Sequence, residues 1–467
     1  MYIQQLYTKC LSEAAYYIES EGVAAIIDPL RDIDDYLQLA KDRNAVIQYI
    51  FETHFHADFV SGHLDLAKAT GAPIVFGPGA KTGYTVHHAT DGEIFPLGAC
   101  SIEVLHTPGH TMESVCYLLR NEKGQEHALF TGDTLFVGDV GRPDLSSGGM
   151  SSEELAGILY ESLQQKILPL PDAVLVYPAH GPGSSCGKSL GPDTWSTLGE
   201  QKKLNYALQP STKEAFIEKV TSGLQDAPKY FSINAQINQK GYTPLNELKQ
   251  KGLTPLTIET FKNAAQQGAI ILDTRPATTF TTGFIPGSIF IGLEGRFAEW
   301  AGALLPFNQS IILVTEPGAE EASLVRLTRV GFEKIHGYLE GGFQTWLNAG
   351  EPTDMVIDVE ADELWMDIPH DPRLTIVDVR KEGEFAEGHL KSAINLPLSE
   401  MTDVAEIAQF NESQNLYIHC AGGYRSVIAA SIFKKHGFHN LRNVLGGWGS
   451  ISKLKNVQVV KETAALN

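Results

Sequence analysis

The chain has 467 residues, which is too long for one hydrophobic core and corresponds to about three domains of ~100–200 residues each. Hydrophobic residues make up 43% of it and charged residues 20%, as in ordinary globular proteins. The net charge of −20, with no cluster of Lys and Arg, argues against a nucleic acid or an anionic membrane as partner. No apolar run approaches the ~18 residues of a membrane-spanning helix, and the first residues lack a secretory signal. We therefore expect a cytoplasmic protein.

Short apolar runs alternate with loops rich in Gly, Pro and His over residues 1–235, which we predict to be the first domain. Residues 24–29 predict a buried strand that ends in a turn, and residues 45–51 predict a second strand. A helix from Asp65 is expected to stop at Gly71. The second strand runs directly into a loop that is rich in potential metal ligands.

Four loops of this domain present imidazole or carboxylate groups beside predicted strands. In chain order they carry His54, His56 and Asp58, then His110 in a Pro-Gly turn, then Asp133 after an apolar run, and then His180. Strands hold such ligand atoms rigidly apart and leave them accessible, which is what a metal site requires. A single histidine of this kind is more often structural, but the ordered set predicts a metal site.

The motif His-x-His-x-Asp at 54–58, followed by a separate His, Asp and His, resembles the metallo-β-lactamase superfamily over roughly residues 1–230. The resemblance implies an αββα sandwich. Members with two metals usually have a further histidine where this chain has Phe59, so the departure argues against a second metal. Within the superfamily, three stretches resemble the persulfide dioxygenases, namely residues 110–114, 131–135 and 141–144.

The likeness to persulfide dioxygenases implies one Fe(II) per chain, held by His54, His110 and Asp133. Two histidines and one carboxylate form the facial triad of non-haem Fe(II) oxygenases, which leaves positions open for a thiolate and O₂. Zinc is the alternative metal. The residues expected to orient ligands or substrate by hydrogen bonds are His56, Asp58 and His180.

An internal repeat fills the second half of the chain. Residues 271–275 match residues 376–380 at an offset of 105, and Gly-Gly-aromatic sequences occur near the end of both copies. Two copies of about one hundred residues indicate a domain duplication. Because strand-like and helix-like segments alternate, each copy should form a largely parallel α/β sheet with helices on both faces. We place the copies at 254–352 and 355–467, with linkers near 235–255 and 350–370.

The second copy carries a cysteine, Cys420, between a predicted strand at 415–419 and a predicted helix at 427–433. A helix N-terminus stabilises an anion, so this position favours a thiolate, and Arg425 supplies positive charge for an anionic substrate. The loop resembles the rhodanese active site, together with residues 378–380 and 387–390, which implies that Cys420 is the catalytic thiol. The residues expected to surround a persulfide on it are Ala421, Gly422, Gly423, Tyr424 and Ser426.

The first copy has Thr315 and Glu320 where the second has Cys420 and Arg425. It therefore cannot carry a persulfide, and we expect it to be a spacer or a docking surface. In the first domain, Cys186 lies six residues beyond His180. It is a candidate relay thiol at the rim of the metal pocket, where Lys188 could favour its thiolate.

These features together resemble a persulfide dioxygenase–rhodanese fusion of bacterial sulfide detoxification. The implied reaction oxidises a glutathione- or coenzyme A-type persulfide with O₂ to sulfite, and Cys420 passes sulfur to sulfite to give thiosulfate. One alternative is a zinc-dependent thioester hydrolase similar to glyoxalase II, fused to a sulfurtransferase. Another is a sulfur carrier or persulfide sensor with a vestigial metal site. We also expect a homo-oligomer.

Overall fold

The computed structural model describes residues 1–145, 149–210, 212–224, 226–455 and 457–462, so the predicted end of the last domain lies outside the described residues. The chain forms two compact units. Unit 1 comprises Met1–Asn246 and Thr328–Gly331, and unit 2 comprises Glu247–Leu327 and Phe332–Asn467. Within the described ranges no helix is both long and apolar enough to cross a membrane.

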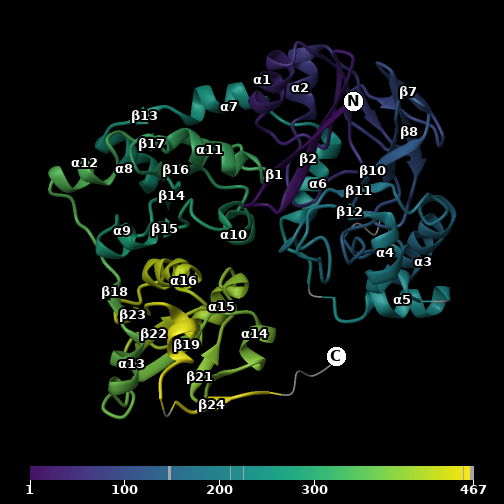
Figure 1. Ribbon diagram of the computed structural model, residues 1–467. Coiled ribbons are helices and arrows are strands. Elements are labelled where there is room, and N and C mark those ends of the chain that lie inside the picture. The colour runs from purple at the N-terminus through teal and green to yellow at the C-terminus, as the bar shows by residue number, and fades with distance from the viewer. Residues whose placement is uncertain (146–148, 211, 225, 456, 463–467) are drawn as a thin grey trace. The chain divides into compact units, whose positions relative to one another are not determined.

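Two six-stranded sheets form the centre of unit 1 (Figure 1). In spatial order the first contains β1 (Tyr2–Thr8), β2 (Glu13–Ser20), β3 (Val23–Ile27), β4 (Val46–Phe51), β5 (Ile74–Phe76) and β6 (His87–His88). The second contains β12 (Ser196–Thr197), β11 (Leu175–Pro178), β10 (Glu126–Gly132), β9 (Val115–Arg120), β8 (Cys100–His106) and β7 (Ile94–Leu97). The two strands predicted at 24–29 and 45–51 are β3 and β4.

Side chains of β2 show why the sheets stack, because this strand is buried on both faces. Tyr16 and Ile18 enter the core between the sheets and meet Tyr117 and Phe130 of the second sheet. Tyr17 packs on the opposite face, in the cluster that also includes helix side chains. Because successive side chains of a strand point to opposite faces, the apolar residues of β2 contribute to both hydrophobic cores.

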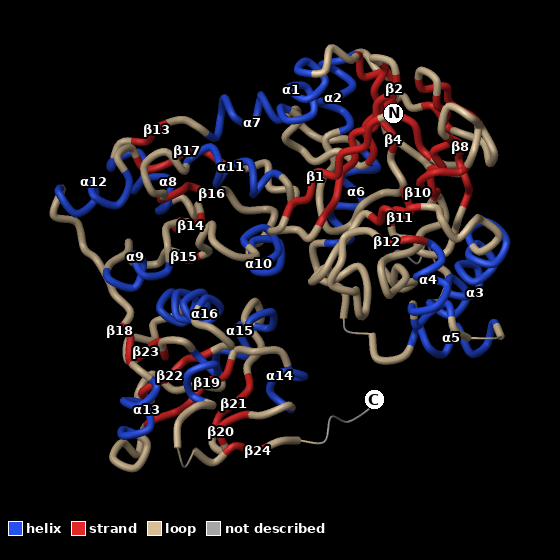
Figure 2. The backbone as a smooth tube through the Cα atoms, viewed as in Figure 1, coloured by secondary structure: helices blue, strands red, loops and turns tan. Residues whose placement is uncertain are grey.

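Helices cover the outer face of each sheet of unit 1 (Figure 2). They are α1 (Asp34–Asp42) and α2 (His63–Thr70) on the first sheet, and α3 (Ser152–Ser162) and α5 (Lys213–Thr221) on the second. The α2 helix ends at Gly71, whose φ of 75° is left-handed, as the sequence predicted. The αββα sandwich is confirmed.

Unit 2 contains two five-stranded sheets with the same strand order. The first is β13 (Pro255–Leu256), β17 (Ile335–Leu339), β16 (Ile311–Val314), β14 (Ile270–Asp273) and β15 (Ile289–Phe290). The second is β18 (Ile357–Val359), β23 (Leu441–Val444), β22 (Asn415–His419), β19 (Leu374–Asp378) and β21 (Ala393–Asn395). Every described strand pair in both is parallel, which confirms the two parallel α/β repeats.

Equivalent helices accompany the two sheets of unit 2. The first repeat has α8 (Ile258–Gln266), α9 (Ala277–Thr282), α10 (Phe297–Leu304), α11 (Glu320–Thr328) and α12 (Gly342–Asn348). The second has α13 (Ala361–Asp367), α14 (Glu382–Ala386), α15 (Val404–Ala408), α16 (Tyr424–Lys435) and α17 (Gly447–Ile451). Both stretches predicted as linkers contain regular structure. They hold α6 (Phe231–Lys240), α7 (Leu245–Gly252), β18 and α13.

Candidate functional site

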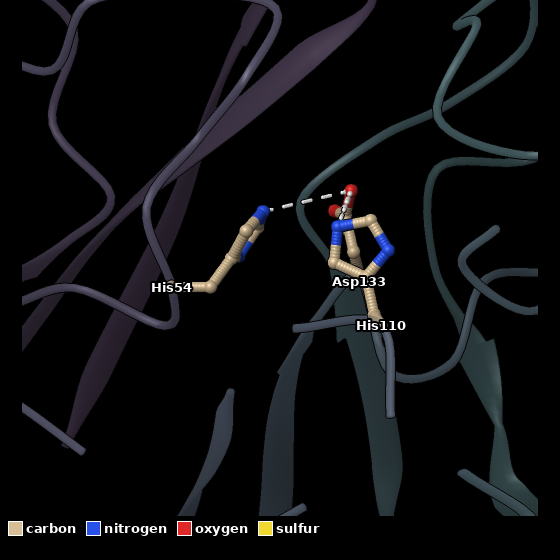
Figure 3. Close-up of side chains that lie close together, drawn as sticks. All are labelled: His54, His110 and Asp133. Carbon is tan, nitrogen blue, oxygen red and sulfur yellow. Dashed lines mark ion pairs between the residues drawn. The ribbon is translucent and has the colours of Figure 1, made fainter. Parts of the chain in front are cut away.

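The three residues predicted to bind a metal lie just beyond strand ends and face one another (Figure 3). Their potential ligand atoms all lie within 4.8 Å of one another, and all three side chains are buried. Nε2 of His110 is 3.4 Å from Oδ2 of Asp133, and Nε2 of His54 is 3.7 Å from the same atom. The sequence-predicted set is therefore brought together in space.

Hydrogen bonds at the other ring nitrogens orient both histidines. Nδ1 of His110 lies 2.9 Å from the carbonyl oxygen of Arg142, and Nδ1 of His54 lies 3.0 Å from Oγ1 of Thr53. With Nδ1 engaged, each ring directs Nε2 at Asp133. Such partners fix the ring position and tautomer of a metal-binding histidine.

The charges at this point of unit 1 suit a cation. Burial and the neighbouring imidazoles lower the pKa of His54 well below its ordinary value, so the neutral form that binds metals is favoured. Both carboxylate oxygens of Asp133 are buried and have no hydrogen-bond partner in the part of the chain that the structure describes. A buried carboxylate of this kind between two imidazoles fits a divalent metal ion.

A second donor group adjoins the first and contains His56, Asp58 and His180. Nε2 of His180 lies 3.6 Å from Oδ1 of Asp58 and 3.5 Å from Oδ1 of Asp133. His56 has its Nε2 3.0 Å from Asp28. Burial lowers the pKa of His56, but Asp28 and two further carboxylates outweigh it and raise the pKa to about 10. His56 is thus paired with carboxylates, and Asp28 is a partner that the sequence did not reveal.

Phe59 occupies the place of the expected histidine and belongs to the core. Its ring is fully buried and lies 4.3 Å from the ring of His56 between centroids. The loop around it is held by Asn238 of α6, whose Nδ2 donates to the carbonyls of His56 and Phe59 at 2.8 Å each. Oδ1 of Asn238 accepts from the backbone N–H of Ser61 at 2.9 Å. No motif marks Asn238, which lies about 180 residues further along the chain.

Cys186 lies deeper than the predicted rim. It is 2% exposed, and its sulfur lies within 4.8 Å of potential ligand atoms of Asp133 and His180. The expectation that Lys188 favours its thiolate is wrong, because Nζ of Lys188 donates to the carbonyl of Ser222 at 2.5 Å. Burial and two nearby carboxylates raise the pKa of Cys186 well above its ordinary value. The environment favours the neutral thiol.

Cys420 directly follows β22, and α16 begins four residues later. The thiol is buried, its Sγ accepts a hydrogen bond from the N–H of Gly423 at 3.1 Å, and Oγ of Ser426 lies 3.7 Å away. Arg425 is already paired, since its guanidinium donates to both carboxylate oxygens of Glu384 on α14 at 2.6 and 2.8 Å. This hydrogen bond lowers the pKa of Glu384. Sequence reasoning missed Glu384.

The first repeat presents no thiol at the equivalent place. Thr315 follows β16 and is buried, and Glu320 begins α11. The position of Cys420 is thus filled by a hydroxyl side chain and that of Arg425 by a carboxylate.

Comparisons with known proteins agree with the folds of unit 1 and unit 2. The family model of the metallo-beta-lactamase superfamily matches residues 8–180, and that of the rhodanese-like domain matches residues 257–349 and 360–454. A solved metallo-beta-lactamase from Staphylococcus aureus subsp. aureus COL is 33% identical, with a TM-score of 0.64. The match covers 73% of this chain and 98% of that one.

Two curated relatives are similar at nearly equal identity. The mitochondrial persulfide dioxygenase of Bos taurus is 32% identical over 41% of this chain and 68% of its own length. A probable hydroxyacylglutathione hydrolase of Schizosaccharomyces pombe is 33% identical over 35% of this chain, which spans 60% of that relative. The chain belongs to the metallo-beta-lactamase superfamily, with two rhodanese-like domains after that domain. The predicted resemblance to a persulfide dioxygenase–rhodanese fusion is confirmed.

Proposed function

We propose that the chain oxidises a low-molecular-weight persulfide at the metal centre and transfers sulfur through Cys420. The observation that carries the proposal is the donor set of His54, His110 and Asp133, with the buried Phe59 in place of a further ligand. Two imidazoles and one carboxylate are typical of mononuclear Fe(II) sites that bind O₂. The chain's similarity to a persulfide dioxygenase supports the same reaction.

In this proposal, His54, His110 and Asp133 hold one Fe(II), which when bound supplies the chemistry that joins O₂ to sulfur. The balanced reaction is RSSH + O₂ + H₂O → RSH + SO₃²⁻ + 2H⁺. The terminal sulfur is oxidised and O₂ is reduced. The residues do the positioning, because the hydrogen bonds at both Nδ1 atoms fix the rings. The buried surroundings exclude bulk water from the reacting sulfur.

Sulfur transfer in the C-terminal repeat has two steps. Cys420 takes the outer sulfur of a second RSSH and releases RSH. Sulfite then attacks that sulfur, so that Cys–S–S⁻ + SO₃²⁻ → Cys–S⁻ + S₂O₃²⁻. The N–H of Gly423, 3.1 Å from Sγ, stabilises the departing thiolate. Sulfide detoxification follows as the physiological role.

A zinc-dependent thioester hydrolase is the second candidate for the first domain. Its support is the similarity to a probable hydroxyacylglutathione hydrolase and the proximity of His180 and Cys186 to Asp133, with Asp58 3.6 Å from His180. Those residues would have to hold a second metal without a histidine at position 59.

Metal content and oxygen uptake separate the two candidates. The protein is purified without added metal and mixed with glutathione persulfide. About one iron per chain with O₂ consumption and sulfite or thiosulfate as product is the expected result. His110→Ala should lose both iron and O₂ uptake, whereas His87→Ala, at an exposed histidine of β6, should keep both. Two zinc ions, no O₂ uptake and hydrolysis of S-lactoylglutathione would overturn the proposal.

We also propose Cys186 as a relay beside the metal centre, whose thiol attacks the outer sulfur of RSSH to give Cys186–SSH and releases RSH. Its sulfur lies close to Asp133, the carboxylate of the proposed triad. Cys186→Ser should keep iron and lose sulfur labelling at this position, detected by mass spectrometry. Unchanged turnover in that variant would rule the relay out.

A further inference from the structure

The thiol loop of the second repeat is bonded to the backbone of the cysteine-free repeat within unit 2. The hydroxyl of Tyr424, the first residue of α16, donates to the carbonyl of Gly292 at 2.7 Å. Its ring lies edge-on to Phe290, with centroids 6.1 Å apart. A Cβ placed on Gly295 would lie 3.5 Å from this ring. The backbone at Gly295 has a φ of +93°, which a residue with a side chain rarely adopts, so glycine permits this shape.

A second connection starts at the other side of Arg425. Oγ of Ser426 donates to Oδ1 of Asn443 at 2.6 Å, and Nδ2 of Asn443 donates to Oδ1 of Asp358 at 2.8 Å. The other oxygen of Asp358 accepts from Oγ1 of Thr281 in the first repeat at 2.8 Å. Ser426, Asn443 and Thr281 are each at most 2% exposed, whereas Asp358, which accepts the last two hydrogen bonds, is exposed.

We propose that the cysteine-free repeat positions the persulfide loop, through Tyr424 and through the hydrogen-bonded series Thr281, Asp358, Asn443 and Ser426. The inference rests on the proposed sulfur transfer at Cys420 and gives the first repeat a role other than spacer. The two anchored residues flank Arg425 in the first turn of α16, so a rotation of that turn would move the guanidinium and the N–H groups around Sγ. Such donors are effective only when they are held in place before the substrate binds.

Thr281→Val is the sharpest test, because it removes one hydroxyl from the first repeat and keeps the shape of the side chain. We expect kcat/KM for sulfur transfer to fall by about three- to tenfold, the usual range for one hydrogen bond. The alkylation rate of Cys420 should shift to higher pH as its donors loosen, and Thr281→Ser should restore both. Thr282→Val is the matched control, since this neighbour is exposed and its hydroxyl bonds within its own helix.

Tyr424→Phe gives an independent variant that removes one hydroxyl from the other connection. Tyr338→Phe is its control, because no hydrogen bond to the Tyr338 hydroxyl is present among the described residues. Oxygen uptake at the metal centre should be unchanged in all variants, and thermal unfolding of unit 2 followed by circular dichroism should match the wild type, which shows that each variant has folded. Normal transfer and alkylation in both Thr281→Val and Tyr424→Phe would overturn the inference. If the wild-type protein shows no sulfur transfer, the proposed function is refuted. The inference would then still be tested by comparing the alkylation rate of Cys420 between the variants and the wild type.

Discussion

The two repeats of unit 2 share one buried ion pair and differ in one loop. In the first, Arg275 donates to Asp273 at 2.9 and 2.6 Å and to a backbone carbonyl eight residues further on at 2.9 Å. In the second, Arg380 donates to Asp378 at 2.9 and 2.6 Å and to the corresponding carbonyl at 2.8 Å. Because the cysteine-free repeat keeps the pair unchanged, the Asp-x-Arg motif serves the fold rather than the chemistry.

The loops after the central strands carry the difference. Their backbones are closed in the same way, since Gly342 lies against the carbonyl of Thr315 as Gly447 lies against that of Cys420. Both glycines have a positive φ and leave no room for a Cβ. The repeats therefore share a loop backbone and differ in its side chains. Function is determined by those side chains and not by the fold.

Replacing the thiol should have the largest effect. Cys420→Ser should lower sulfur transfer by about 10³-fold or more, because the nucleophile is lost. Thr315→Ala, at the matching place in the first repeat, should change it by less than about twofold. Thiosulfate formation and the mass of the sulfur-labelled protein report the outcome. A label that persists in Cys420→Ser at a cysteine other than Cys186 would place the acceptor thiol elsewhere.

Breaking the shared ion pair should destabilise both repeats to a similar extent. Asp378→Asn and Asp273→Asn each leave a buried guanidinium without its charge partner, at a cost of about 3–5 kcal/mol. Urea unfolding of the full chain, followed by hydrogen exchange in each repeat, measures the losses. A large loss in the second repeat alone would show that the pair supports the active loop rather than the common fold.

Local patterns explain how much of the fold was predictable. The apolar runs that became β3 and β4 and the stop at Gly71 were visible because strand burial and helix termination depend on neighbouring residues. The duplication was visible because two copies of one fold must conserve the same buried positions. The helices α6 and α7 were predicted as part of a linker, because their sequence is polar and their burial depends on contacts with distant loops.

The candidate site likewise contains residues that the sequence predicts and residues that it does not. His54, His110 and Asp133 could be found from their order along the chain, and the structure brings them together. Asn238 could not be found, because it supports the first loop from a helix about 180 residues away. The hydrogen-bond partner of Lys188 could not be predicted either, because its long side chain donates to a backbone carbonyl instead of lying beside the nearby thiol. Sequence order identifies donor types, but only packing decides which partner a flexible side chain takes.

Removing the carboxylate that pairs with Arg425 tests whether this arginine, which the first repeat lacks, binds the anionic acceptor. Glu384→Gln frees the guanidinium, which is otherwise bonded at both of its terminal nitrogens. We expect the KM for sulfite to fall by about three- to tenfold, because an anionic acceptor no longer competes with an internal carboxylate. Steady-state kinetics of thiosulfate formation test this. An increase in KM would mean that Glu384 holds Arg425 in its productive orientation.

The smallest expected effect is a difference in acid sensitivity between the repeats. Arg425 lowers the pKa of Glu384, so the ion pair contributes stability above the carboxyl group's unfolded pKa of about 4.3 and loses it as the pH falls through the folded pKa. The first repeat has Thr279 at the matching position and Glu320 in place of the arginine, so it lacks this pair. Since Glu384 is about one-third exposed, solvent screening limits the contribution to about 0.5–1 kcal/mol.

Hydrogen exchange at pH 7 and pH 4 should show this loss around α14 and the start of α16 in the wild type. The same segments of Glu384→Gln should lack that component, and an equal loss in both proteins would assign the acid sensitivity to other carboxylates.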